Sequence, residues 1–322
     1  MNIFILFFIL FSVAFARPYV IQIVTDSSGQ TNAENFISRA SSLEPFKQLI
    51  EKKILKFEIP KVLNHLKCRG GNSGIPRLAQ CDLTEVKQVC NEASLCPVLT
   101  SFPDIGAGAQ RYPIVSTSFP WTTMLHEMVH TFNFTDEYAY TKSEAPLYCQ
   151  GTSWINGSSQ IAKNEFPTNE MALEVCKKNI PWCQTALNQG AIVTQKIAEG
   201  KFKIGSSPEK CPNTKLGVYL GGSCQQQNSS TWRPYFCPTV MGYPSLGEDT
   251  CNVKKRHAII EQSPNLLPLF YQKAIFNKIV AHTNNSQVSF EERDLPNTEN
   301  HVYGIPEVDK LSGSTNLPDY CH

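Results

Sequence analysis

The spacing of apolar positions divides the first sixty residues into three segments. Residues 3–15, IFILFFILFSVAF, are an almost unbroken apolar run. Residues 19–25, YVIQIVT, form a β-branched run that predicts a buried strand ending at the polar turn 26–29. Residues 31–56 carry apolar side chains at helical spacing, and Pro45 predicts a break in that helix.

The next seventy residues predict one punctuated stretch and two regular elements. Residues 66–109 are rich in Cys, Gly and Pro, and we expect them to be irregular and stapled by disulfides. Residues 112–116, YPIVS, predict a strand, and Pro113 favours a sheet edge because proline donates no ladder hydrogen bond. Residues 120–132 predict a helix, whose first turn tolerates Pro120.

The second half of the chain predicts an insert, a turn and two helices. Residues 139–235 are polar and punctuated, and we interpret them as a long insert around one helix near 167–178. Residues 236–243, FCPTVMGY, predict a tight turn. Residues 253–262 and 266–281 predict the two helices.

The apolar run at the N-terminus has the length of a signal-peptide core and is short for a membrane span. Ala14 and Ala16 supply small residues at the positions that a signal peptidase reads, so we expect cleavage after Ala16. The alternative is an uncleaved anchor or a buried strand. No later stretch is long and apolar enough to cross a bilayer. We therefore expect a secreted protein with no membrane contact after cleavage.

Twelve cysteines follow the leader, an even number. In an exported chain this usage predicts disulfides, since the compartment is oxidising. A cysteine-ligated zinc site is the alternative, but the sequence contains no CxxC pair to favour it. The sequence leaves the pairing open.

Composition and charge narrow the classes of partner. The chain has 322 residues with 41% hydrophobic residues, enough for one large domain or two modest ones with a real core. Charged residues are 18% and the net charge is +1. Because that balance offers no positive field to a polyanion, we expect no nucleic-acid partner.

The candidate chemistry lies in residues 124–140, MLHEMVHTFNFTDEYAY. His126 and His130 are four residues apart, so a helix places both imidazoles on one face, where they can reach one zinc ion. Glu127 follows the first histidine and can act as a general base toward a zinc-bound water. The apolar residues of this helix form an arc on the opposite side: Trp121, Met124, Leu125, Met128, Val129 and Phe132.

A third ligand is expected six residues after the second histidine. Asp136 occupies that position, and Asn133 can provide the left-handed turn that brings the chain back to the metal. Glu137 is the weaker candidate for the ligand. It either orders this turn or lies near the zinc, or is a solvated charge, and Tyr138 is read as a packed aromatic residue.

These residues resemble a known superfamily of zinc peptidases. HEMVHTFNFTD resembles the metzincin pattern HExxHxxGxxH/D, with Asp as third ligand as in the snapalysin branch. The DEY ending at 136–138 is similar to IgA-peptidase-like zinc peptidases, and 240–243, VMGY, is similar to the metzincin Met-turn. The chain departs from the pattern in two respects: Asn133 replaces the usual glycine, and residues 141–213 match nothing in the family.

The resemblance implies an α/β (α+β) fold, a two-lobed zincin domain with an active-site helix, a Met-turn and a disulfide-rich insert. It also implies an edge strand that pairs with extended substrate, for which residues 110–118 are the candidate. The expected organisation is a signal peptide (1–16), a catalytic domain (17–281) with an upper lobe (about 17–132) and an insert plus lower lobe (about 133–281), and a C-terminal tail (282–322).

The function implied by the resemblance is that of a secreted Zn²⁺-dependent endopeptidase that acts, as a monomer, on protein or peptide substrates. The metal ligands would be His126, His130 and Asp136. Tyr243 either hydrogen-bonds the oxyanion or is a packed aromatic residue, and Met241 is a structural floor beneath the metal.

Three alternatives remain open from the sequence. A gluzincin-type peptidase would take its third ligand from the predicted helix that carries Asn169, Glu170 and Glu174. A binding or adhesion module could keep zinc structurally, although such a site has no need of Glu127. A non-peptidase zinc hydrolase acting on a cell-wall or carbohydrate ester is the third.

Overall fold

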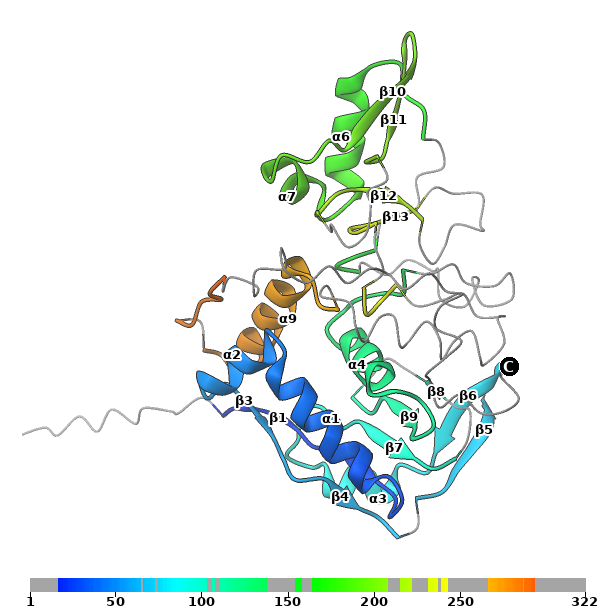
Figure 1. Cartoon of the computed structure of the whole chain (residues 1–322), viewed down its shortest axis with the longest axis vertical. Coiled ribbons are helices and arrows are strands. Elements are labelled where there is room, and N and C mark those ends of the chain that lie inside the picture. The colour runs from blue at the N-terminus through cyan, green and yellow to red at the C-terminus, as the bar shows by residue number, and fades with distance from the viewer. Residues whose placement is uncertain are drawn as a thin grey trace, which may run out of the picture.

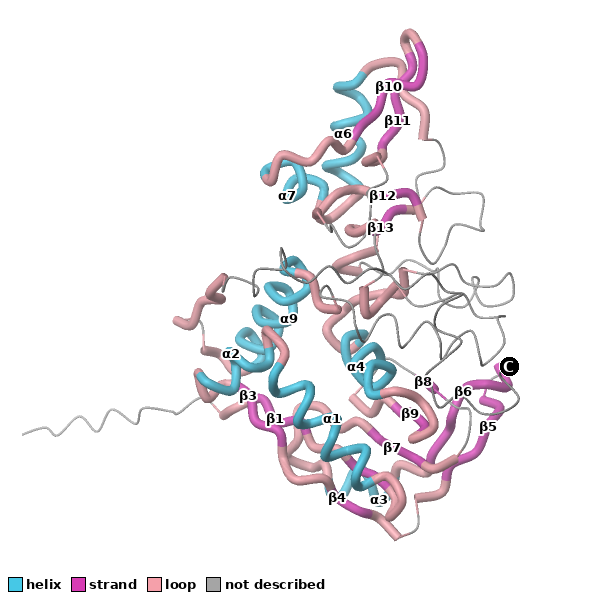
Figure 2. Tube along the Cα trace, in the orientation of Figure 1, coloured by secondary structure: helices cyan, strands magenta, loops and turns pink. Residues whose placement is uncertain are grey.

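The structure is a computed structural model, and it combines helices and sheets in one α+β fold (Figures 1 and 2). It describes residues 17–64, 66–72, 75–102, 106–107, 111–137, 154–157, 164–207, 215–221, 231–236, 239–242, 266–285 and 287–292. The predicted signal peptide and the predicted helix at 253–262 lie outside these residues. Within them, no helix is long and apolar enough to cross a membrane.

A five-stranded sheet forms the body of the molecule, in the order β4-β2-β7-β9-β8. The first four of these strands are mutually parallel, and β8 runs antiparallel to β9 at the edge. Their bounds are β2 (Val24–Thr25), β4 (Lys61–Val62), β7 (Val98–Thr100), β8 (Gly106–Ala107) and β9 (Ile114–Ser116). The predicted strand at 19–25 is confirmed as β1 (Tyr19–Ile21), which pairs in parallel with β3 (Leu55–Phe57), followed by β2.

Side chains of the sheet alternate between two hydrophobic clusters, as the period of a strand requires. Leu99 and Val115 pack on one face with α1 (Gln30–Ser42) and α4 (Trp121–His130). Their neighbours Val98 and Ile114 pack on the other face, where α3 contributes Val86. The helix α3 spans Thr84–Val89. Covered on both faces, the sheet supplies a rigid support for α4.

Two predictions about the region before α4 were wrong. Strand β9 lies between β7 and β8, so residues 112–116 are interior and not a sheet edge. Pro113 precedes the strand, and its carbonyl accepts the hydrogen bond of Val98 N at 2.7 Å, so the missing N–H costs the ladder nothing. Residues 66–109 are also not irregular: they include α3 and an antiparallel hairpin of β5 (Cys68–Asn72) and β6 (Ile75–Cys81).

Asp26 fastens the turn between β2 and α1 to the neighbouring strand end. Its Oδ1 accepts hydrogen bonds from Ser28 Oγ at 2.6 Å and from the backbone N–H groups of Ser28 and Gly29, both at 3.2 Å. Its Oδ2 accepts from Ser101 N at 2.6 Å, just beyond β7. Burial acts to raise the pKa of Asp26, but these hydrogen bonds outweigh it and leave the pKa below its ordinary value.

We expect Asp26 to make stability fall with acid. Since its folded-state pKa lies below the unfolded value, its stabilising contribution is present above about pH 4 and is lost as the pH falls through the folded-state pKa. Asp26→Asn should therefore lose less stability than the wild type between about pH 4 and pH 2. Urea unfolding at both pH values checks this, and equal losses in the two proteins would contradict it.

The insert (residues 164–236) projects from the sheet-containing body in Figure 1 and is more structured than the single helix that the sequence predicts. The predicted helix near 167–178 is confirmed as α6 (Asn169–Asn179). It is joined by α7 (Cys183–Asn188), by the hairpin of β10 (Thr194–Ala198) and β11 (Lys201–Ile204), and by the pair β12 (Tyr219–Leu220) and β13 (Trp232–Arg233).

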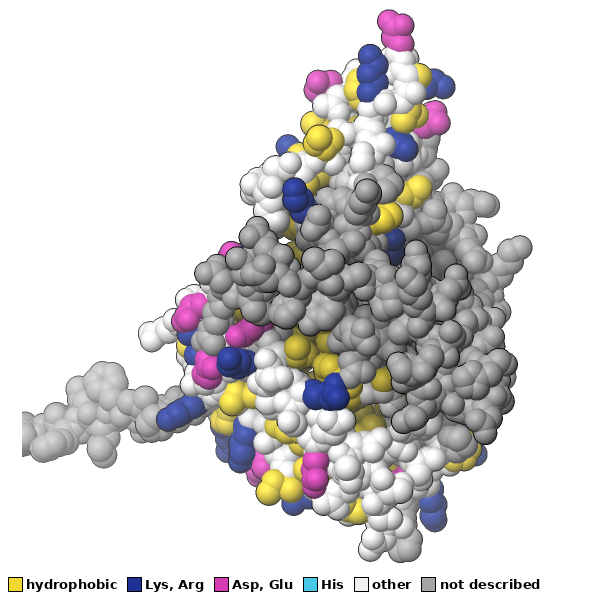
Figure 3. Space-filling view, in the orientation of Figure 1, with side chains coloured by type: hydrophobic (Ala, Val, Ile, Leu, Met, Phe, Trp, Pro, Cys, Tyr) yellow, Lys and Arg dark blue, Asp and Glu magenta, His cyan; other side chains and the backbone are white. Residues whose placement is uncertain are grey.

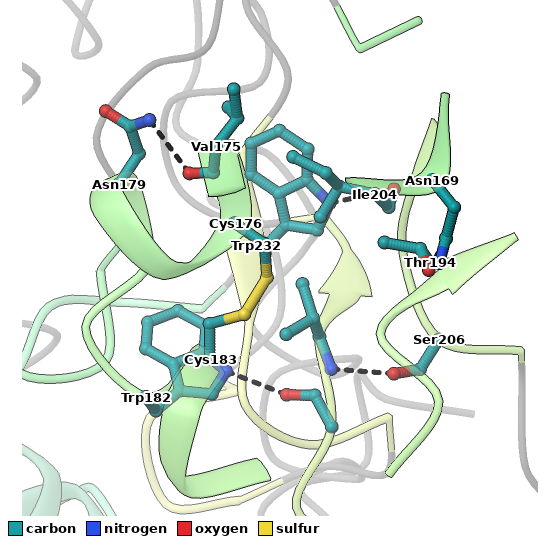
Figure 4. The surroundings of a disulfide bond; sticks show 12 residues. Asn169, Val175, Cys176, Asn179, Trp182, Cys183, Thr194, Ile204, Ser206 and Trp232 are labelled. Atoms are coloured by element: carbon teal, nitrogen blue, oxygen red, sulfur yellow. Dashed lines mark hydrogen bonds between the residues drawn. A yellow bond between two sulfur atoms is a disulfide. The ribbon is translucent and has the colours of Figure 1, made fainter. Parts of the chain in front are cut away.

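Two buried tryptophans and a disulfide hold the insert together (Figure 4). Cys176 of α6 is bonded to Cys183 of α7. Trp182 is buried beside this disulfide and donates from Nε1 to Gly217 O at 2.7 Å. Trp232 is also buried, and its Nε1 donates to Ile204 O at 3.4 Å. The insert is therefore a disulfide-stapled unit, and its buried apolar residues continue the main hydrophobic cluster of the body.

The prediction of disulfides is confirmed for the cysteines that the structure describes. Besides the pair in the insert, Cys68 is bonded to Cys81 across the β5–β6 hairpin, and Cys90 is bonded to Cys96. The remaining cysteines, 149, 211, 224, 237, 251 and 321, lie outside the described residues. Several disulfides in one chain, such as the three in this structure, are typical of proteins in an oxidising compartment.

The last described helix is followed by a segment that packs against α2. The helix predicted at 266–281 is confirmed as α9 (Leu269–His282). Residues 287–292 then reach α2 (Phe46–Glu51), where the buried Gln48 side chain exchanges two hydrogen bonds of 2.9 Å with the backbone of Glu291. The expected C-terminal tail therefore begins with a packed segment.

Surface charge agrees with the low net charge of the sequence. On the face that Figure 3 shows, Lys and Arg side chains are interspersed with Asp and Glu side chains over the described residues.

Candidate metal centre

Helix α4 presents two histidines on the side away from its core-facing arc. The apolar residues Met124, Leu125, Met128, Val129 and Phe132 are buried in the main hydrophobic cluster. His126 and His130 lie one turn apart with their Nε2 atoms 3.2 Å from each other. The prediction that a helix brings the two imidazoles together is confirmed. Because the apolar arc fixes how α4 is rotated on the sheet, it also fixes the direction of both rings.

Backbone carbonyls orient both rings through their other nitrogen. His126 Nδ1 lies 2.7 Å from Val240 O, and His130 Nδ1 lies 2.9 Å from Phe134 O. A carbonyl oxygen can only accept, so each Nδ1 carries the proton and donates. In the neutral rings each Nε2 then presents a lone pair, which is the tautomer that binds metal ions.

The turn after α4 is left-handed at the residue that the sequence indicates. Asn133 has φ 73°, and its N–H donates to His130 O at 2.9 Å. Its own carbonyl accepts from Ile155 N at 2.9 Å. The prediction of a left-handed turn at Asn133 is confirmed. The turn brings Phe134 O within hydrogen-bond distance of His130 Nδ1.

We expect Asn133→Ala to destabilise the protein by about 1 kcal/mol, because the left-handed region costs an L-residue with a Cβ atom roughly 1–2 kcal/mol, which asparagine partly avoids. Asn133→Gly is the matched control, since glycine adopts this conformation without steric cost. Urea unfolding of the metal-free proteins measures both. An alanine variant as stable as the glycine variant would contradict this prediction.

The chain beyond this turn brings Asp136 to both imidazoles. Asp136 Oδ1 lies 3.0 Å from His126 Nε2 and 3.4 Å from His130 Nε2, and all three side chains are largely buried. The three atoms form a nearly equilateral triangle. Because none of them carries a proton when both rings are neutral and the carboxylate is ionised, they repel one another unless a cation or a proton lies among them.

The close approach of His130 and Asp136 shifts the pKa values of both groups. Burial acts to lower the pKa of His130, but the Asp136 carboxylate beside it raises that pKa to about 9. Burial acts to raise the pKa of Asp136, and the two imidazoles outweigh it and hold the pKa well below its ordinary range. The carboxylate is therefore ionised at neutral pH and available to a cation.

Glu127 lies at the rim of this group. His126, Glu127 and His130 can hold a metal ion, since one ligand atom of each lies within 4.8 Å of the others. Glu127 Oε2 is 4.0 Å from His130 Nε2, farther than Asp136 Oδ1. On these distances the Asp136 carboxylate lies nearer to the two imidazoles than the Glu127 carboxylate does.

A short turn at 239–242 contacts His126 and Glu137. Gly242 N donates to Thr239 O at 3.0 Å, and Met241 within the turn is fully buried. Val240 O is the acceptor for His126, and Met241 O accepts from Glu137 N at 2.8 Å. The predicted tight turn is confirmed over these residues and Met241 is buried in it, while the role of Met241 as a floor beneath a metal stays a prediction.

Glu137 is buried and hydrogen-bonded, not solvated. Its Oε2 accepts from Thr239 Oγ1 at 2.9 Å, and its Oε1 accepts from Tyr271 OH and from Asn156 Nδ2 at 3.2 Å. Burial raises the pKa of Glu137, and these three hydrogen bonds oppose that rise. Of the roles left open by the sequence, the structure supports the ordering of the turn. Sequence reasoning missed Thr239, Asn156 and Tyr271, which lie far from the motif and from one another.

The remaining candidate residues from the sequence lie outside the described residues or in the insert. Tyr138 and Tyr243 fall outside the described residues. Glu170 and Glu174 are exposed on α6, in the projecting insert (Figure 1). Among the described residues, neither belongs to the group that can hold a metal ion.

Comparison with known proteins identifies no family for this chain. No protein-family model matches it, and no curated protein matches it. The resemblance to zinc peptidases therefore depends on the motif residues and on the geometry described above.

Proposed function

We propose that the protein is a secreted zinc-dependent endopeptidase with a metzincin-like active site. The observation that carries the proposal is the triangle of His126 Nε2, His130 Nε2 and Asp136 Oδ1, with sides of 3.0, 3.2 and 3.4 Å. Ligands bound to zinc at about 2.0–2.1 Å in a tetrahedron are separated by roughly 3.3 Å. The three atoms therefore fit one face of such a tetrahedron and leave the fourth position for water or substrate.

The donor set also favours zinc over harder cations. Two imidazole nitrogens and one carboxylate oxygen suit zinc, whereas magnesium and calcium prefer oxygen ligands alone. A site with three protein ligands is typical of catalytic zinc, since structural zinc usually has four. The carbonyls of Val240 and Phe134 supply the outer contacts that fix the ring orientations in such sites.

Each residue has a separate role in peptide hydrolysis. A bound zinc ion would polarise the scissile carbonyl and make water a nucleophile near neutral pH. Glu127 accepts the proton of the attacking water and then delivers it to the leaving nitrogen. Its position beside the ligand triangle, 4.0 Å from His130 Nε2, suits this transfer.

Substrate binding by strand addition is proposed for β8 and not for residues 110–118. Strand β8 is the edge of the sheet and runs antiparallel to β9, which leads directly into α4. An extended peptide that pairs with β8 would add to the same sheet from which α4 follows.

The proposal is tested with purified protein that starts at residue 17. We expect about one zinc ion per chain by elemental analysis. Casein should be cleaved, with the activity lost on treatment with a chelator and recovered when zinc is returned. An ester substrate assayed in parallel separates a peptidase from an ester hydrolase. Zinc binding without peptide cleavage would favour a binding module, and full activity after removal of all metal would exclude the proposal.

A further inference from the structure

Glu137 and Thr239 connect the segment that carries Asp136 to the turn that orients His126. Glu137 N donates to Met241 O at 2.8 Å, and Glu137 Oε2 accepts from Thr239 Oγ1 at 2.9 Å. Thr239 Oγ1 in turn accepts from Met241 N at 3.1 Å. The backbone of Met241 is thus hydrogen-bonded through both its N–H and its carbonyl. Val240 lies between Thr239 and Met241, and its carbonyl accepts the hydrogen bond of His126 Nδ1.

We propose that Glu137 and Thr239 are positioning residues that set the metal affinity. They hold Val240 O within hydrogen-bond distance of His126 Nδ1, and they hold the Asp136 carboxylate beside both imidazoles. The inference depends on the metal site proposed above. Glu137 follows Asp136 directly in the chain, so a displacement of its side chain moves the carboxylate that faces the histidines. The same displacement loosens the turn 239–242.

The hydrogen bonds around Glu137 and Thr239 explain why a carboxylate occurs at position 137 and a hydroxyl at position 239. Within the described residues, the side chains that hydrogen-bond to the Glu137 oxygens all act as donors: Thr239 Oγ1, Tyr271 OH and Asn156 Nδ2. Thr239 has a single hydroxyl proton, which goes to Glu137, and a lone pair, which receives Met241 N. Valine at 239 would keep the shape of threonine and remove both bonds, leaving a buried carboxylate oxygen and a buried N–H each short of a partner.

Burial makes this arrangement costly to disturb. Glu137, Thr239, Asn156 and Tyr271 are all at most 4% exposed, so water cannot readily replace a lost partner. Asn156 Nδ2 also donates to Tyr271 OH at 3.1 Å and to Thr135 O at 2.8 Å. The cluster therefore joins four separate segments of the chain around one carboxylate.

The test compares metal binding in four variants, with Co²⁺ as a spectroscopic probe of the ligand geometry. We expect Thr239→Val to weaken Zn²⁺ and Co²⁺ binding by about 10–100-fold, as is typical of residues that orient metal ligands, and to change the visible absorption of bound Co²⁺. Thr239→Ser returns the hydroxyl and should recover most of the lost affinity. Tyr271→Phe removes one donor to Glu137 and should act in the same direction with a smaller effect.

Thr283→Val is the matched control for loss of a buried threonine hydroxyl. Thr283 is buried at the end of α9, and its Oγ1 donates to Val280 O at 3.0 Å. This variant should lose thermal stability without a change in affinity or in the Co²⁺ spectrum.

The outcomes separate this inference from the proposed function. If the wild type binds Co²⁺ but folded Thr239→Val has wild-type affinity and spectrum, the positioning role is wrong and the metal site stands. Should the valine variant not fold, unchanged binding in Tyr271→Phe decides against the role in the same way. A wild type that binds neither metal overturns both the inference and the proposed function.

Discussion

Glu127→Gln is expected to lower kcat/KM for peptide hydrolysis by about 10²–10⁴-fold while leaving zinc bound, because the glutamine amide cannot accept the proton of the attacking water. Glu127 lies 4.0 Å from His130 Nε2, whereas Asp136 Oδ1 is closer to both imidazoles. The loss should therefore appear in kcat, with zinc content near one per chain. Steady-state kinetics on a quenched peptide and elemental analysis of the same sample measure the two quantities.

The matched control is Glu34→Gln, which makes the same chemical change on the exposed surface of α1. It should keep wild-type kinetics. A Glu127→Gln enzyme with undiminished kcat would show that another group moves the proton. A variant that loses its zinc would instead place Glu127 among the ligands.

Asp136→Ala is expected to lose stoichiometric zinc, with an affinity more than about 100-fold below that of the wild type. The loss should exceed the roughly 10–100-fold effect typical of outer partners, because Asp136 contributes one of the three converging atoms. Removing the carboxylate also takes away the negative charge nearest to the two imidazoles, and Glu127, 4.0 Å from His130 Nε2, is the carboxylate that remains beside them. Competition with a chromophoric chelator measures the affinity.

Glu170→Ala and Glu174→Ala test the gluzincin alternative at the same time. Both side chains are exposed on α6, and we expect both variants to bind zinc as the wild type does. Loss of zinc in either of them, together with retained zinc in Asp136→Ala, would transfer the third ligand to the insert.

The elements that the sequence predicts well are those fixed by local periodicity. The apolar arc of α4 sets the helix and the side on which His126 and His130 lie, and both features agree with the structure. Asn133 marks the left-handed turn because few residues other than glycine tolerate positive φ. The six-residue spacing allows Asp136 to reach the histidines, and contacts with distant segments then hold it there.

Strand order was not accessible from the sequence in the same way. Pro113 suggested an edge because proline lacks a donor, but the position of a strand in a sheet depends on pairing between distant segments. Here β8 and β7 flank β9. The hairpin of β5 and β6 was missed because its glycines, proline and cysteines were read as signs of irregular structure, while its pairing is set by the partner strand.

By itself the sequence determined which residues of one helix and one turn belong to the candidate metal centre, since each of these features depends on neighbours within about ten positions. Only the tertiary structure decided what holds them in place. Val240 O reaches His126 across 114 positions, and Tyr271 reaches Glu137 across 134. Buried donors and acceptors must find partners wherever the folded chain brings them, and no periodicity in the sequence records which distant residue will meet that need.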